Sequence, residues 1–222
     1  MKSGTKRKII VVAAIVAIIS ILSVGTLAWY SDSQEKVNKF VVSSDQQGDP
    51  DFSVDVEETF DPTTSDVTPT DTPDGGLQYD GILPGDFLSK EAKAKNTGAY
   101  DEYIRVTVTL TPDDATKWAA MVPNFDLRDC LTDVSTDFVF DTISDDGLTV
   151  VYYYNKVLAA GESTDPVFKG FTVPTTMTVD NSVVNLDLKV KADAVQARNI
   201  VNPDDYASVA LAAKAAFTVL GA

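Results

Sequence analysis

Apolar and polar residues alternate along several short stretches of this chain. Within residues 103–110, the even-numbered positions are apolar and positions 105, 107 and 109 are Arg or Thr. Successive side chains of a β-strand point to opposite faces, so this pattern predicts a strand with one buried face. Residues 186–193 repeat it, with charges of both signs on the polar face. Such half-buried strands favour antiparallel sheets, which leave one face in water.

The remaining strand and helix signals complete the expected fold. A start signal at Pro112 predicts a short helix over residues 113–121, and Asn202-Pro203 precedes an Ala-rich stretch that predicts a C-terminal helix over residues 204–220. The class is therefore mostly β: an antiparallel β-sandwich of jelly-roll type with short helical decorations and a C-terminal helix. Further strands are predicted over residues 52–57, 77–82, 87–95, 138–140, 148–158, 167–173 and 183–195.

The first 28 residues have the composition of a targeting segment. Residues 1–8 are basic and polar, residues 9–24 are almost all Ile, Val, Ala or Leu, and the small residues Thr26 and Ala28 precede Trp29. This three-part pattern is typical of a secretory signal peptide and predicts cleavage after Ala28. The alternative is an uncleaved anchor, because the apolar stretch extended to Tyr30 is long enough to span a bilayer. Cleavage implies that the mature chain is secreted.

The mature chain divides into a polar N-terminal segment, residues 29–48, and a β-sandwich domain, residues 49–222. The N-terminal segment contains one apolar island that is long enough for a strand. We expect this island to act as an assembly strand that pairs with another copy, and its apolar residues are Val37, Phe40, Val41 and Val42. Within the domain, residues 61–76 read DPTTSDVTPTDTPDGG. This acidic, Pro/Thr-rich stretch predicts an extended, solvated loop or stalk.

Charge and residue usage exclude several classes of function. The formal net charge is −15, and removal of the four basic residues of the leader changes it to −19. A domain this acidic repels phosphate backbones, so we expect no nucleic-acid partner, and no membrane contact other than the leader before cleavage. The chain has no histidine, which removes Ser-His-Asp and Cys-His nucleophile systems and ordinary zinc sites. We therefore expect no enzymatic activity and no cofactor.

Two residue types leave narrower alternatives open. Acidic loops at residues 45–49, 61–74 and 141–147 offer oxygen ligands, so calcium is the one metal that the composition allows, although none of these loops has the 12-residue EF-hand pattern. Solvated acidic loops are the simpler interpretation. Cys130 is the single cysteine, so no intramolecular disulfide forms, and we interpret it as a small buried apolar residue rather than a reactive thiol.

A set of short motifs resembles one known family. The leader junction GTLAWYSD at residues 25–32, followed by Asn38-Lys39-Phe40, is similar to the start of the TasA/camelysin family of exported Gram-positive proteins. Further blocks that are similar to those of the family follow in order, LPGD at 83–86, KNTG at 95–98, YIRV at 103–106, GEST at 161–164 and AVQA at 194–197. The leaders of this family are cut by the signal peptidase SipW, and its best-known member forms biofilm matrix fibres. The resemblance implies a SipW-type peptidase as the export partner and self-association into fibres.

Two hypotheses of different classes follow. The first is an exported structural protein of the cell surface or biofilm extracellular matrix that assembles into fibres by donor-strand pairing. The second is a monomeric surface binding module or adhesin that uses the Asp-rich loops, with or without calcium, to hold a ligand. Electron microscopy and sizing of the purified mature protein distinguish the two.

Overall fold

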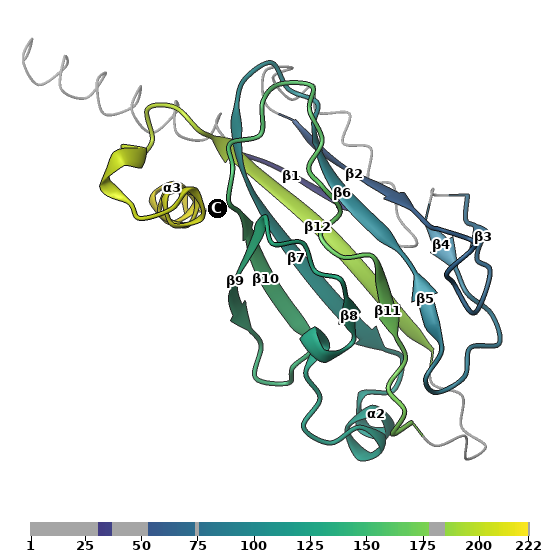
Figure 1. The fold of residues 1–222 in the computed structure, drawn as a ribbon. Helices are drawn as coiled ribbons and strands as arrows, with labels where there is room; N and C mark the ends of the chain where they lie inside the picture. Colours follow the sequence, from purple (N-terminus) through teal and green to yellow (C-terminus); the bar gives the residue numbers. More distant parts are fainter. Residues whose placement is uncertain (1–30, 37–52, 74–75, 178–184, 222) are drawn as a thin grey trace, which may run out of the picture.

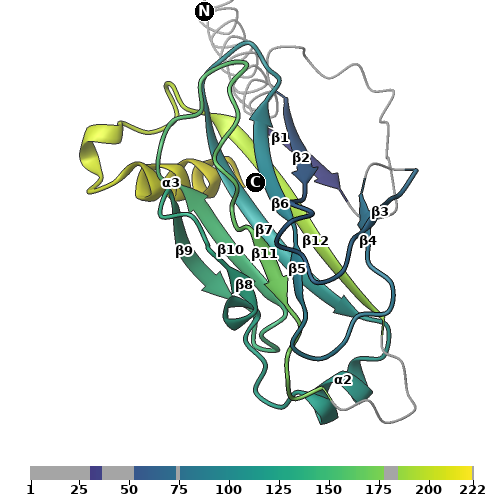
Figure 2. The same ribbon diagram turned by 45° about the vertical axis from the view of Figure 1, so that its right-hand side comes forward.

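The computed structural model describes residues 31–36, 53–73, 76–177 and 185–221, and these residues form a mostly β structure. Its strands are antiparallel and lie in two layers that enclose one core (Figures 1 and 2). Two α-helices, α2 (Ala115–Met121) and α3 (Val209–Leu220), lie outside the layers. This arrangement confirms the predicted fold class, an antiparallel β-sandwich with a C-terminal helix.

The first layer is a five-stranded sheet. Its strands, in spatial order, are β1 (Ser31–Lys36), β12 (Leu186–Gln196), β7 (Glu102–Pro112), β10 (Thr149–Tyr154) and β9 (Phe138–Ile143). β12 and β7 pair along their whole length, from Leu186 opposite Pro112 to Gln196 opposite Glu102. The predicted alternation is confirmed here, because the even-numbered residues from Ile104 to Leu110 and from Leu186 to Ala194 belong to the core, whereas Arg105 and Asp193 lie on the opposite face.

The second layer covers the inner face of this sheet. β2 (Val54–Thr59) pairs with β6 (Glu91–Asn96), and β11 (Gly170–Thr172) pairs with both β5 (Phe87–Ser89) and β8 (Leu131–Thr132). The predicted single strand over residues 87–95 is thus divided at Lys90. The segment before β11 continues along β6, where the backbone N–H groups of Thr164 and Val167 donate to the carbonyls of Ala94 and Ala92.

α3 packs on the outer face of the five-stranded sheet, on the side away from β2, β6 and β5 (Figure 1). Ala213, Ala216 and Phe217 of α3 form a second apolar cluster with Tyr103 and Tyr153 of the sheet. In the run 152–154, the middle ring therefore lies on the opposite face from its neighbours and is buried by α3. Phe217 and Tyr153 have ring centroids 5.8 Å apart.

α2 and the turn that follows it close one end of the core. Trp118 of α2 is buried in the main core and contacts Phe125 edge to face, with ring centroids 5.0 Å apart. Asp114 caps the helix by accepting from the backbone N–H of Lys117. Cys130 is buried directly before β8, as the sequence predicted.

One sequence-based expectation becomes narrower and one needs correction. Residues 61–73 form a mostly exposed loop rather than a free stalk, because the backbone N–H of Asp66 donates to the Phe87 carbonyl and its carboxylate accepts from the Phe87 N–H. β3 (Thr70–Asp71) also pairs with β4 (Leu77–Gln78). The C-terminal helix begins at Val209 rather than near residue 204, because Ser208 caps it and Asn202 caps a separate 3-10 turn, Pro203–Asp205.

Candidate functional site

β1 is the strand through which the N-terminal segment joins the sheet. It pairs antiparallel with β12, with Ser31 opposite Val195 and Lys36 opposite Val190. The sequence of β1 is SDSQEK, which contains no apolar residue. Because β1 has no apolar side chain to bury, its backbone hydrogen bonds with β12 have to stabilise it in the sheet. Figure 2 shows β1 beside β12 and near β2.

The residues that the sequence predicted for cleavage and assembly lie outside the described part. This applies to both sets, Thr26, Ala28 and Trp29 for cleavage and Val37, Phe40, Val41 and Val42 for assembly. β1 lies within the predicted N-terminal segment 29–48, shortly after Trp29. Sequence reasoning missed β1, because a strand without apolar residues gives no period-2 hydrophobic signal.

β12 extends further than β1 does. Pairing with β1 ends at Val190, whereas pairing with β7 on the other side continues to Leu186. In the described ranges, Asp187 and Leu188 have no strand partner on the side of β1. Leu186 and Leu188 are half-buried and pack against the main core. A backbone edge flanked by apolar side chains is a place where an extended segment can add to a sheet.

The outer face of β12 is held by an ion-pair cluster beneath α3. Arg105 Nη2 lies 2.9 Å from Asp193 Oδ2, and Lys191 Nζ lies 3.0 Å from Asp193 Oδ1. The Arg105 guanidinium also lies over the Phe217 ring, 4.5 Å from its centroid. Asp193 is almost fully buried, so two cations compensate its desolvation. This cluster ties β12, β7 and α3 together behind the β1 edge.

A second buried ion pair crosses the other layer. Lys90, between β5 and β6, lies 2.5 Å from Glu58 of β2, and the two side chains are only 3% and 2% exposed. Nearby, the Tyr79 hydroxyl donates to the Ser89 carbonyl. Burial, and then the charge of Glu58, raise the pKa of Tyr79 well above its ordinary value. The pair joins the two ends of the long connection between β2 and β5.

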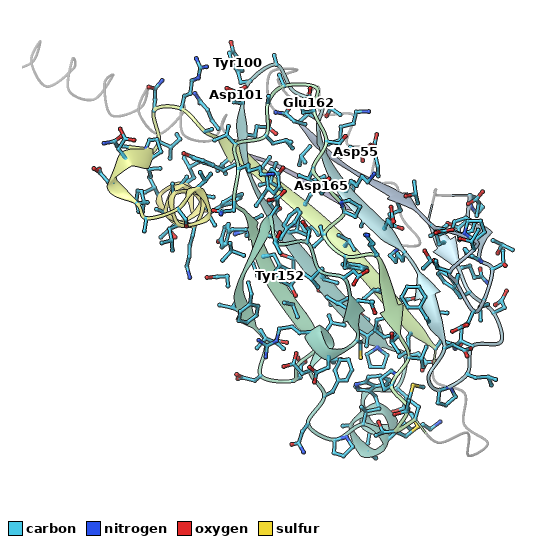
Figure 3. The ribbon with its side chains drawn as sticks, in the orientation of Figure 1. Asp55, Tyr100, Asp101, Tyr152, Glu162 and Asp165 are labelled. Carbon is cyan, nitrogen blue, oxygen red and sulfur yellow. The ribbon has the colours of Figure 1, made fainter. Side chains whose placement is uncertain are left out.

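The carboxylates of the described acidic loops accept hydrogen bonds from nearby residues of the same loop and do not converge on one site. The Asp61 carboxylate accepts from the Thr63 hydroxyl and N–H, and these hydrogen bonds lower its pKa. Asp146 accepts from the Ser144 hydroxyl, with the same effect on its pKa. Figure 3 shows Asp55, Asp101 and Glu162 towards one end of the sandwich. Among the residues that the structure describes, no three acidic or cysteine side chains come together as a metal site.

The environment of Cys130 lowers the reactivity of its thiol. Burial raises its pKa to about 11, and the carboxylates of Asp129 and Asp126 add to the rise. The thiolate is the reactive form of cysteine, and at pH 8 a thiol with this pKa is almost entirely protonated. Burial therefore favours the unreactive, protonated form of Cys130.

We expect iodoacetamide to alkylate Cys130 at pH 8 about 100-fold more slowly in the native protein than in guanidinium chloride, because unfolding restores an ordinary thiol pKa. Intact mass spectrometry over time measures both rates in the same sample. The fast reaction in denaturant is the internal control. Equal rates in the two conditions would contradict the burial of Cys130.

Comparison of the chain with family models, with curated proteins and with solved structures found no match. In the part of the chain that the structure describes, no helix is both long enough and apolar enough to cross a bilayer.

Proposed function

We propose that this chain is an exported structural protein of the cell surface or biofilm extracellular matrix, and that it assembles into fibres by donor-strand pairing. The observation that carries the proposal is the position of β1. It is polar, it comes first among the described elements, and it forms the outermost strand beside β12. A strand of this kind can leave one copy and occupy the same place in the next.

The energetics of exchange support this mechanism. A β1 strand from another copy can form the same backbone hydrogen bonds with β12 that the chain's own β1 forms. Exchange of an identical element therefore changes few interactions, and protein concentration and the connecting segment decide between the closed and the exchanged form. β1 is at the edge, and the remaining strands of the sheet, β12, β7, β10 and β9, pair with one another without it. We therefore expect them to stay paired when β1 leaves. The donor surface, β1, differs from the acceptor surface, the β12 edge of the next copy. The contact can therefore repeat from copy to copy and build a fibre.

The proposed route to the outside of the cell comes from the sequence. The leader pattern and its resemblance to the TasA/camelysin family support cleavage between Ala28 and Trp29 by a SipW-type signal peptidase. That cleavage frees the chain next to β1, which begins at Ser31. We propose no enzymatic activity and no cofactor. The acidic surface keeps separate copies soluble until strands pair.

Deletion of residues 29–36 from the mature protein is expected to abolish fibres while leaving a folded domain. The domain should lose about 2–4 kcal/mol of stability, because each of several backbone hydrogen bonds contributes ~0.5–1.5 kcal/mol. Electron microscopy and light scattering measure fibres, and circular dichroism measures folding. A synthetic peptide of residues 29–42 should bind the deleted protein and restore its thermal stability. Fibres that persist after the deletion would rule out donor-strand pairing.

Proline substitutions in β1 give a matched control for that deletion. Successive N–H groups of a strand point to opposite edges, so only one of Ser33→Pro and Gln34→Pro removes a donor that faces β12. One of these two variants should lose fibres far more strongly than the other, and Ser33→Ala and Gln34→Ala should keep them. A wild-type mature protein that stays monomeric in microscopy and sizing would favour the binding-module alternative.

A further inference from the structure

β9 forms the edge of the five-stranded sheet opposite to β1. It pairs with β10 on one side, and no strand within the described ranges pairs with its other side. Its sequence, FVFDTI, contains no Lys, Arg or Pro, which are residues that commonly prevent pairing at sheet edges. The register with β10 shifts between Val151 and Tyr152, so residues 138–140 and residues 142–143 form two regular segments on either side of Asp141.

Apolar side chains flank this open edge on both faces. Val139 and Phe140 are 42% and 40% exposed, and as neighbours in a strand they point to opposite faces. The Phe140 ring contacts Tyr152 with centroids 6.2 Å apart, and the Arg128 guanidinium lies 4.5 Å from its centroid. An exposed aromatic ring that is fixed by its neighbours loses little conformational entropy when a partner covers it.

α3 extends the apolar surface on the outer side of β9. Lys214 of α3 forms an ion pair with Asp141 of β9. At the start of α3, the Ala210 N–H donates to Asn155 Oδ1, and the Asn155 N–H donates to the Asp137 carbonyl beside β9. Leu211 is 49% exposed and lies one helical turn before Lys214. Leu211 is thus an exposed apolar side chain on the side of α3 that Lys214 ties to β9.

Charge distinguishes this edge from the rest of the molecule. The mature chain carries −19, so two copies repel each other over most of their surfaces. Along β9, in contrast, three carboxylates each have a cation, and these pairs are Arg128–Asp126, Lys156–Asp137 and Lys214–Asp141. These pairs reduce the negative charge along the edge, where Asp129 and Asp165 also lie near Arg128 and Lys156. Lower charge and exposed apolar side chains both favour contact between two acidic copies.

We propose that the β9 edge, meaning β9 with the exposed side chains of Val139, Phe140 and Leu211, binds the β9 edge of a second copy. The two strands pair antiparallel about a two-fold axis, so that the same surface is used on both copies and the two five-stranded sheets become continuous. β1 and β9 lie at opposite edges of the sheet. This contact is therefore independent of strand exchange at β1, and the two can exist together.

Val139→Lys is expected to weaken the contact at least about tenfold, because a two-fold axis brings two new like charges together. The matched control is Val157→Lys, since Val157 is 43% exposed but lies outside β9. Analytical ultracentrifugation of the mature protein measures pairing where the protein stays soluble. Where fibres form, electron microscopy measures whether they associate side by side. Wild type and Val157→Lys should pair, and Val139→Lys should not.

Hydrogen exchange at several protein concentrations identifies the paired strand. Amides of Phe138–Ile143 should become more protected as the concentration rises, and this effect should disappear in Val139→Lys. Pairing that occurs without any fibres would support the β9 contact and contradict strand exchange at β1. The β9 proposal is overturned if Val139→Lys and Val157→Lys associate equally, if wild type neither pairs nor bundles, or if β1 gains protection together with β9, which would indicate head-to-tail pairing.

Discussion

Replacing Glu58 with alanine is expected to destabilise the folded domain by about 3–5 kcal/mol, because the substitution removes the carboxylate that compensates the buried charge of Lys90. Lys90 Nζ lies 2.5 Å from Glu58 Oε2, and both side chains are almost completely buried. In a chain of this size, that loss lowers the melting temperature by roughly 10 °C. Thermal and urea unfolding of the mature protein measure it.

The same two strands provide a matched control. Glu57 of β2 and Lys95 of β6 form an ion pair at 2.9 Å whose side chains are 41% and 40% exposed. Glu57→Ala should cost less than about 1 kcal/mol, because water already solvates both charges. Replacing the buried pair together, with Glu58→Leu and Lys90→Met, should be much less destabilising than Glu58→Ala alone. Equal losses from Glu58→Ala and Glu57→Ala would show that burial does not determine the strength of these pairs.

The sequence could have indicated the buried pair. Glu58 continues the inward alternation of Val54 and Val56 one residue beyond the predicted strand 52–57, and Lys90 shares the alternation of Ala92 and Ala94 within the predicted strand 87–95. Both charged residues therefore fall at inward positions. Opposite charges at inward positions of two strands are a signal for a buried pair. The sequence pattern does not show which strands pair, because β2 and β6 are far apart in the chain. Alternation therefore predicted the faces of the strands but not their neighbours.

β1 shows the complementary limit of sequence reasoning. Alternation located strands such as β7 and β12, whose apolar residues fill the core. It failed for β1, whose sequence SDSQEK has nothing to bury and which forms a strand by pairing with β12. For residues 61–73, Pro and Thr predicted a solvated loop or stalk, and the loop is mostly exposed, but the local sequence did not indicate the hydrogen bonds with Phe87 that hold it against β5. Tertiary contacts decide structure where local preference is weak.

Phe217→Ala is expected to cost about 3–5 kcal/mol and to loosen α3 from the sheet, because it removes the largest buried side chain of the helix. Phe217 is buried against Tyr153 and under the Arg105 guanidinium. The other buried residues of α3 are alanines, each of which contributes little apolar area of its own. Loss of the ring also admits water to the pair of Arg105 and Asp193, which weakens that ion pair.

Two variants separate the contributions of the ring. Phe217→Leu keeps most of the apolar volume but removes the contact with the guanidinium, so it should cost about 1–2 kcal/mol. Val219→Ala, at an exposed position of the same helix, should change stability by less than about 0.5 kcal/mol. Hydrogen exchange of the α3 amides reports detachment directly and should accelerate in Phe217→Ala only. If Phe217→Ala melts like Val219→Ala and its α3 amides stay protected, the capping by Ser208 and the alanine face, rather than Phe217, would hold the helix on the sheet.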